Sequence, residues 1–215
     1  ILGWAGGNAY TFMKNAMNRG VSGSFITESS DRVEKAVSKL FNSNRQIAYF
    51  SNKADAIKYA RLFSKESTIV WKPWSTFQQD ISSVKSIVFA PTFPWTDSIY
   101  IVAIQKDLYS ENIELDDFAK NKMKIPFPLQ AGIARSIYNL IEALSERKET
   151  DWFIYDSILT KYWTRKGPYL FPKVPKENYD KFILHCLSLG IIINPNYDSP
   201  SIVPFGADKG VFTKL

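Results

Sequence analysis

The sequence predicts an α/β fold in two parts, and three observations lead to it. Of its 215 residues, 45% are hydrophobic, which is typical of a globular chain with one full core or two small ones. In the first half, short apolar and β-branched runs alternate with helical patterns, which favours a mostly parallel, reduced sheet flanked by helices. The second half starts with a long amphipathic pattern followed by helices and short strands. We therefore expect an α/β domain over residues 1–125 and a smaller α+β domain over residues 126–215.

The first half is predicted to hold three helices and four strands. Gly20 ends the first helix, Asp31 and Glu34 resemble a capping box at the start of the second, and Ser51 or Asn52 caps the third. The helices are expected over residues 9–19, 31–41 and from about 53 to 62, and the strands over residues 46–50, 67–71, 84–89 and 99–104. A polar linker over residues 106–124, with a helix near 115–122, follows.

The second half is predicted to alternate helices with short strands. Pro128 stands where the first residue of a helix would be, and Gly190 suits the position that follows a helix. Helices are expected over residues 129–146, 151–164 and from 175 to 189, and strands over residues 169–171, 191–193 and 201–203.

Composition excludes several classes of protein. One Cys and one His can form neither an internal disulfide nor a structural zinc site, and no apolar run reaches the ~20 residues that span a bilayer. The net charge of +6 and the 15% aromatic content permit a nucleic-acid-binding domain. The basic residues do not cluster, so we favour a basic surface over an aromatic core. The start lacks a basic segment of the signal-peptide type, and we expect a cytoplasmic protein without a membrane partner.

Few residues carry catalytic patterns. His185 and Cys186 are neighbours in a predicted helix, and adjacent helical residues do not share a face, so we expect a core cysteine and no catalytic pair. The glycine-rich residues 3–8 match no phosphate-loop spacing. Asp97 and the acidic residues of 111–117 are interpreted as turn and surface residues. No catalytic residue and no metal ligand is therefore predicted.

The strongest candidate site is the turn Ser51-Asn52-Lys53, which joins a predicted strand to a predicted helix. Ligands of open α/β sheets bind at the carboxyl ends of strands, and Lys53 adds a positive charge there. The same residues also suit an ordinary helix cap. We retain Ser51, Asn52 and Lys53 as candidate cofactor-binding residues.

Several blocks, read in order, resemble the fold-type I pyridoxal-phosphate aminotransferase superfamily. Residues 47–62 are similar to its strand, phosphate-cradling turn and helix, and residues 68–74 to its next strand. Residues 127–138 resemble the helix that leads into its small domain. Residues 167–175, Gly-Pro-Tyr-Leu-Phe-Pro-Lys-Val-Pro, resemble the first strand of that domain, and residues 180–195 resemble the helix and turn that follow.

The sequence also departs from this superfamily. Its members are usually much longer. Lys53 and Ala54 stand where the phosphate turn normally offers small polar residues, and no Lys lies in a recognisable Schiff-base motif; Lys72 and Lys85 are the nearest by order. The final strand, residues 201–203, lacks the Arg that the resemblance implies for a substrate carboxylate, and a bidentate guanidinium is hard to replace.

Three functions follow from these features. The first is an aminotransferase-like protein that has lost transamination, carries no cofactor, and binds a small anionic ligand, a protein partner or a second copy of itself. Aromatic residues such as Trp4, Trp74 or Trp95 would then serve the interface, and burial in the core of the monomer is the alternative that suits them as well. The second is an active pyridoxal-phosphate enzyme with a relocated lysine, Lys53 or Lys72. The third is the nucleic-acid-binding domain.

Overall fold

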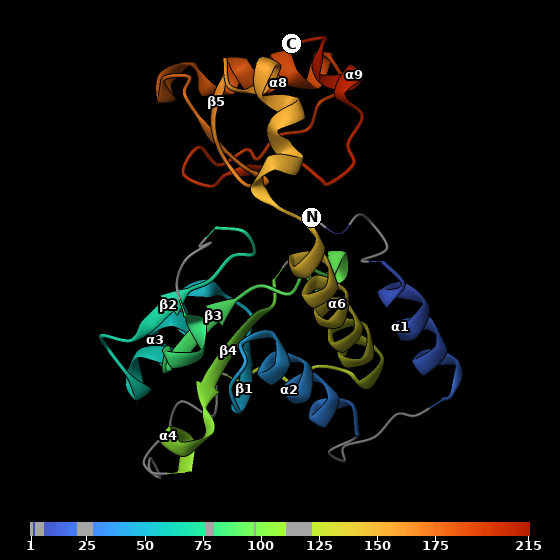
Figure 1. Ribbon diagram of the computed structural model, residues 1–215, viewed down its shortest axis with the longest axis vertical. Coiled ribbons are helices and arrows are strands. Elements are labelled where there is room, and N and C mark those ends of the chain that lie inside the picture. The colour runs from blue at the N-terminus through green and yellow to red at the C-terminus, as the bar shows by residue number, and fades with distance from the viewer. Residues whose placement is uncertain (1, 3–6, 21–27, 76–79, 97, 111–121) are drawn as a thin grey trace. The chain divides into compact units, whose positions relative to one another are not determined.

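The computed structural model describes residues 2, 7–20, 28–75, 80–96, 98–110 and 122–215 (Figure 1). They form two compact units, an N-terminal unit that ends at Ser145 and a C-terminal unit over Glu146–Leu215. The predicted boundary at residues 125 and 126 lies before the long helix α6 (Phe127–Glu146), whereas the units divide at its last residue. The helix belongs to the first unit because its buried residues, Ile133, Ile137 and Leu140 among them, pack in that unit's core.

The N-terminal unit is built on a four-stranded sheet in the order β1-β4-β3-β2. The α/β class predicted from the sequence is confirmed. Its mostly parallel sheet is corrected, because β4 pairs antiparallel with both β1 and β3, and of these neighbours only β2 and β3 are parallel. The strands are β1 (Arg45–Phe50), β2 (Thr68–Val70), β3 (Ser86–Phe89) and β4 (Tyr100–Gln105).

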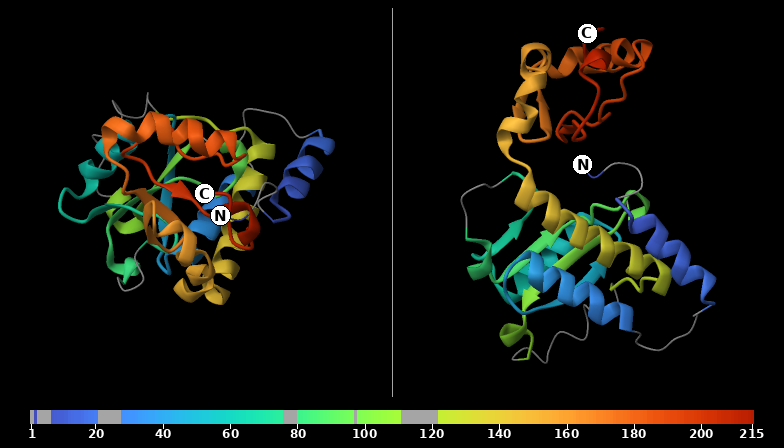
Figure 2. Two further views of the ribbon diagram at one scale, coloured as in Figure 1. Left: turned by 90° about the horizontal axis from the view of Figure 1, so that it is seen from above. Right: turned by 45° about the vertical axis from the view of Figure 1, so that its right-hand side comes forward.

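Helices cover both faces of this sheet (Figures 1 and 2). On one face, the buried Ala56, Tyr59 and Ala60 of α3 pack on Phe50, Val102 and other core residues of the strands. On the other face, Phe41, which follows α2, meets Phe89 of β3 edge to face at 5.3 Å between ring centroids. The helices of this unit are α1 (Ala9–Asn18), α2 (Glu28–Leu40), α3 (Lys53–Phe63), the short α4 (Lys106–Ser110) and α6.

Close packing between α1 and α6 depends on one glycine. A Cβ atom added at Gly132 of α6 would lie 2.9 Å from Cε1 of Phe93 and 3.3 Å from Cβ of Met13 in α1. Phe93 is itself buried, so its ring has little room to move. The glycine of the block over residues 127–138 is therefore explained by packing between helix and loop.

A buried arginine fixes the loop before β3. Arg45 is 2% exposed and donates to the carbonyl oxygens of Val84 at 2.7 Å and Ile81 at 3.2 Å, and to Oγ of Ser43 at 2.8 Å. Burial lowers the pKa of Arg45 to about 10. These contacts hold the short 3-10 turn η1 (Ile81–Ser83) against the end of β1. Sequence analysis did not single out Arg45, and its partners are backbone atoms that no motif marks.

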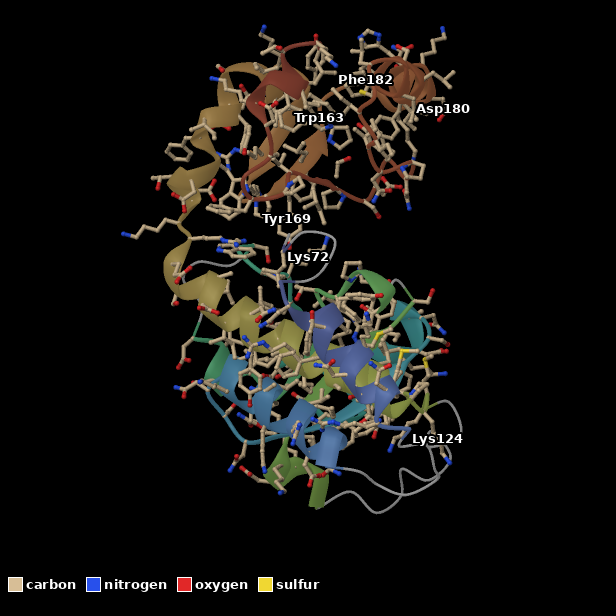
Figure 3. All side chains as sticks on the ribbon, turned by 90° about the vertical axis from the view of Figure 1, so that its right-hand side faces the viewer. Lys72, Lys124, Trp163, Tyr169, Asp180 and Phe182 are labelled. Atoms are coloured by element: carbon tan, nitrogen blue, oxygen red, sulfur yellow. The ribbon has the colours of Figure 1, made fainter. Side chains whose placement is uncertain are left out.

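The C-terminal unit is an α+β unit around a three-stranded antiparallel sheet in the order β5-β6-β7. Its core contains Trp152, Trp163 and Phe182, and the last two rings lie 5.2 Å apart (Figure 3). The elements are η4 (Glu149–Tyr155), α7 (Asp156–Leu159), β5 (Trp163–Lys166), β6 (Tyr169–Pro172), η5 (Lys176–Asn178), α8 (Tyr179–Ser188), β7 (Ser201–Ile202) and α9 (Lys209–Phe212).

Two predictions for this unit are wrong. The helix over residues 151–164 ends at Leu159, and its last residues belong to β5, because Trp163 is buried and Thr164 exposed in the alternation of a strand. The strand over residues 191–193 is absent from the described sheets. Ile191 and Ile193 are buried and Ile192 is 88% exposed, as in a strand, but this segment pairs with no described strand.

Candidate functional site

The candidate site lies along one edge of the N-terminal sheet. Because β4 is antiparallel to both of its neighbours and β2 is parallel to β3, the strands β1, β2 and β3 run in one direction. Their carboxyl ends therefore share one edge, which is where open α/β sheets bind ligands. Residues 51–53 follow β1, and residues 71–75 follow β2, so the two outer strands of the sheet deliver the candidate side chains.

The predicted turn Ser51-Asn52-Lys53 joins β1 to α3, and all three residues are exposed. Asn52 is the N-cap of α3, and its side-chain oxygen accepts a hydrogen bond from the backbone N–H of Asp55 at 2.8 Å. Its amide group also donates to the Asp55 carboxylate at 2.6 Å. Asn52 is thus engaged in capping, and Ser51 and Lys53 are the members of the turn that remain for a ligand.

Lys72 lies in a tight turn after β2. Its carbonyl oxygen accepts hydrogen bonds from both the backbone N–H, at 3.2 Å, and the hydroxyl, at 2.6 Å, of Ser75. Trp71 before it and Trp74 after it are buried. The backbone of Trp71 also donates to the carbonyl of Val88 at 2.8 Å, which continues the contact between β2 and β3. The backbone of this turn is thereby anchored by two buried tryptophans, one on each side of Lys72 in the sequence.

The same turn contains an unusual backbone conformation. Trp74 has a φ of +58°, a left-handed conformation that is strained for a bulky residue. Burial of the ring, which is 4% exposed, supplies the compensating apolar contact. The sequence analysis placed Trp74 at a candidate interface, and its burial corrects that expectation. Strained residues of this kind cluster at ligand sites.

Electrostatics link the two turns. Partial burial lowers the pKa of Lys72, and the positive charge of Lys53 lowers it further. Two cations that repel each other at a strand-end edge attract an anion, because a negative charge between them offsets both the repulsion and the desolvation. The sequence named Lys53 for the site and Lys72 only as a candidate lysine. Their proximity depends on strand order, which a local pattern does not reveal.

The other residues considered from sequence do not join this edge. His185 is exposed on α8, and Cys186 is fully buried beside it, which confirms the core cysteine; burial raises the pKa of its thiol. Both lie in the C-terminal unit. Lys85 is exposed just before β3, at the opposite end of that strand from the edge. Residues 3–6, Asp97, the acidic segment 111–117 and the side chain of Trp95 lie outside the described residues.

The C-terminal unit contains a buried ion cluster that sequence analysis missed. The side chain of Arg165 in β5 is 5% exposed. It donates to both carboxylate oxygens of Asp156, to Glu149 at 2.6 Å and to the carbonyl of Gly167 at 2.9 Å. These bonds raise the pKa of Arg165. The guanidinium is occupied by this network, which ties η4 and α7 to the sheet, so its role is structural.

No protein-family model matches the sequence. An uncharacterized protein of Treponema pallidum (strain Nichols) is 34% identical over 58 residues, which are 27% of this chain and 19% of that protein. The chain thus matches less than a fifth of the length of this curated relative.

Solved structures resemble nearly the whole chain. A serine palmitoyltransferase from S. paucimobilis superposes with a TM-score of 0.63 and 10% identity, over 96% of this chain and 82% of that one. An 8-amino-7-oxononanoate synthase from Francisella tularensis superposes with a TM-score of 0.64 and 11% identity, over 97% of this chain and 90% of that one. An ornithine aminotransferase from Plasmodium yoelii superposes with a TM-score of 0.62 and 13% identity, over 97% of this chain and 82% of that one. The chain has the fold of the fold-type I pyridoxal-phosphate aminotransferases, which confirms the resemblance seen in the sequence.

The strand-end edge fits one part of pyridoxal phosphate better than the rest. Lys53, the start of α3 and Lys72 offer positive charge for a phosphate. The nearest carboxylate in the turn, Asp55, is held by the Asn52 amide. Burial lowers the pKa of Lys72, and the charge that lowers it further is that of another lysine, Lys53. The edge therefore offers positive charge of the kind that suits an anion. Within the described residues, no helix is long and apolar enough to cross a membrane.

Proposed function

We propose that this protein is an aminotransferase-fold protein that binds a small phosphate- or carboxylate-bearing ligand at the strand-end edge and does not transaminate. One observation carries this proposal: the turns that hold Lys53 and Lys72 follow strands that end at the same edge of the sheet. The charge of Lys53 adds to burial in lowering the pKa of Lys72. The aminotransferase-like fold supplies the scaffold, and fold alone does not fix activity.

Lys72 and Lys53 would contact the ligand from turns that differ in rigidity. Lys72, fixed by Ser75 and the buried Trp71 and Trp74, presents one ammonium group from a rigid base. Lys53, at the first position of α3, presents a second from an exposed and adaptable position. A bound anion would accept hydrogen bonds from both, and the start of α3 adds the positive end of its dipole.

The alternative is an active enzyme in which Lys72 is a relocated nucleophile. The lowered pKa of Lys72 supports it, because a larger fraction of the amine is then unprotonated near neutral pH. The positive charge of Lys53, which acts on Lys72, and the lack of an Arg in β7 oppose it. When bound, pyridoxal phosphate would supply the electron sink for the substrate carbanion.

A titration with pyridoxal phosphate separates the two proposals. The protein is incubated with the compound, treated with borohydride and digested, and peptides are analysed by mass. We expect reversible binding without a stoichiometric adduct on Lys72. A stoichiometric adduct on Lys72 alone would contradict the binding proposal and favour the enzyme.

Inorganic phosphate tests the anion site itself. We expect calorimetric binding that is lost in Lys72→Met and weakened in Lys53→Ala. Lys124→Met is the matched control, because Lys124 is an exposed lysine of the N-terminal unit, before α6, that lies well away from Lys72 (Figure 3). Equal phosphate binding by all four proteins would show that the pair is not a site.

A further inference from the structure

The face of α3 that points away from the sheet carries a second recognition surface. Ala56, Tyr59, Ala60 and Phe63 form the inward face and pack in the core. The outward face surrounds a shallow depression of about 560 Å³. We name this surface the basic groove and define it by the residues that line it, which are Ala54, Ile57, Lys58, Arg61, Leu62 and Lys65.

The basic groove combines cations with an apolar floor. Lys58, Arg61 and Lys65 are all exposed, and their spacing of three and four residues places them in one row along the helix. Leu62 is 43% exposed and Ile57 is half-buried. Among the described residues that line the depression, none is acidic. A row of positive charge beside exposed aliphatic side chains is an unusual arrangement for a helix that merely faces solvent.

We propose that the basic groove binds an acidic amphipathic segment of a partner protein. Carboxylates of the segment would pair with Lys58, Arg61 and Lys65, and its aliphatic side chains would cover Leu62 and Ile57. Both the charged and the apolar residues are needed. The charges speed the association of the partner, and salt screens them. The apolar contacts are not screened, so they keep the segment bound at higher salt.

Charge and polarity argue against other occupants. A second copy of this chain, docked by the same face, would bring three cations against three cations, since a two-fold interface repeats one patch. A nucleic acid would satisfy the cations with phosphates but would leave the Leu62 and Ile57 side chains without apolar partners. The acidic peptide is the occupant that matches both features.

The test uses the full chain and a labelled peptide built of Glu and Leu at helical spacing. Fluorescence anisotropy measures its binding, and a peptide with Gln in place of Glu tests the role of charge. We expect Arg61→Glu to weaken binding at least about tenfold, and Leu62→Ser to weaken it severalfold without changing its salt dependence. Lys181→Glu, an exposed lysine of α8, serves as the control and should bind as the parent does.

Three results would overturn the proposal. The first is equal binding of the Glu peptide by the parent and by Arg61→Glu, with circular dichroism showing that both are folded. The second is displacement of the peptide by single-stranded DNA together with indifference to Leu62→Ser, which would assign the face to nucleic acid. The third is self-association that Arg61→Glu abolishes in sedimentation velocity, which would assign the face to a second copy.

Discussion

Asn52 and Asp55 exchange two hydrogen bonds across the first turn of α3. The Asn52 side-chain oxygen accepts from the Asp55 N–H at 2.8 Å, and the Asn52 amide donates to the Asp55 carboxylate at 2.6 Å. This pair sets the start of the helix that carries both Lys53 and the basic groove. The candidate site and the proposed docking surface therefore share one structural support.

Replacing the cap should loosen this support. We expect Asn52→Ala to lower the free energy of unfolding by about 1 kcal/mol, because one N–H in the first turn loses its acceptor. Chemical denaturation with far-UV circular dichroism measures the change. Ser51→Ala is the control, since Ser51 is exposed and precedes the cap. An equal loss in both variants would mean that the cap contributes nothing specific.

The charge of Lys72 should cost stability near neutral pH. Its pKa is lower in the folded protein than in the unfolded chain, so the unfolded chain holds more protons between the two pKa values, and stability rises with pH across that window. Lys72→Met should therefore be at least as stable as the parent at pH 7 and should lose this rise at alkaline pH. Denaturation curves at a series of pH values from neutral to alkaline measure both effects.

The control for this series is Lys124→Met, because Lys124 is exposed and its removal leaves Lys53 and Lys72 in place. It should retain the parent's rise in stability at alkaline pH. A Lys72→Met variant that keeps the full rise would contradict the assignment of the effect to Lys72.

A methyl group at residue 132 should destabilise the N-terminal unit. Alanine is the better helix former by about 1 kcal/mol, but the added Cβ of Gly132→Ala would meet the buried Phe93 ring at 2.9 Å. Overpacking costs about 1–3 kcal/mol, so we expect a net loss of up to about 2 kcal/mol. Thermal unfolding of Gly132→Ala, with Glu142→Ala at an exposed position of α6 as control, measures it. A gain in stability would show that the helices can separate freely.

Breaking the ion cluster should unfold the C-terminal unit more easily. Arg165→Met removes the cation that binds the side chains of Asp156 and Glu149. Because these carboxylates are about a third exposed, water offsets part of the loss, and we expect a cost of about 1–3 kcal/mol. Near-UV circular dichroism reports the environment of Trp152 and Trp163 in this unit. Lys166→Met, the exposed neighbour in β5, should unfold as the parent does, and matching behaviour of the two variants would contradict the prediction.

Local chemistry in the sequence predicted much of the N-terminal unit. Asn52 as a cap, the apolar run that became β1 and the pattern of α6 are short-range signals, and each lies within a few residues of its predicted position. The direction of β4 was missed, although a signal existed. The connection over residues 90–98 is shorter than the dozen or so residues that a parallel crossover needs, so it favours an antiparallel return.

Other features depend on tertiary contacts that no local pattern encodes. Trp163 fits a helical face and a strand face equally well, and pairing with β6 decides for the strand. Ile191 and Ile193 alternate with an exposed Ile192, yet a strand also requires a partner. At the candidate site, the sequence indicated Lys53, but the presence of Lys72 at the same edge follows from the shared direction of β1 and β2.

The position of β4 has a consequence for how the chain acquires its structure. Among the described strands, β1 pairs with β4 alone, with Arg45 opposite Gln105, although β2 and β3 lie between them in sequence. Such pairing of distant segments has a high contact order and slows folding. During synthesis, β1 and α3 emerge well before the strand that completes the sheet, and their apolar surfaces stay uncovered meanwhile. The nascent N-terminal unit therefore exposes apolar surface until Tyr100–Gln105 has been synthesised.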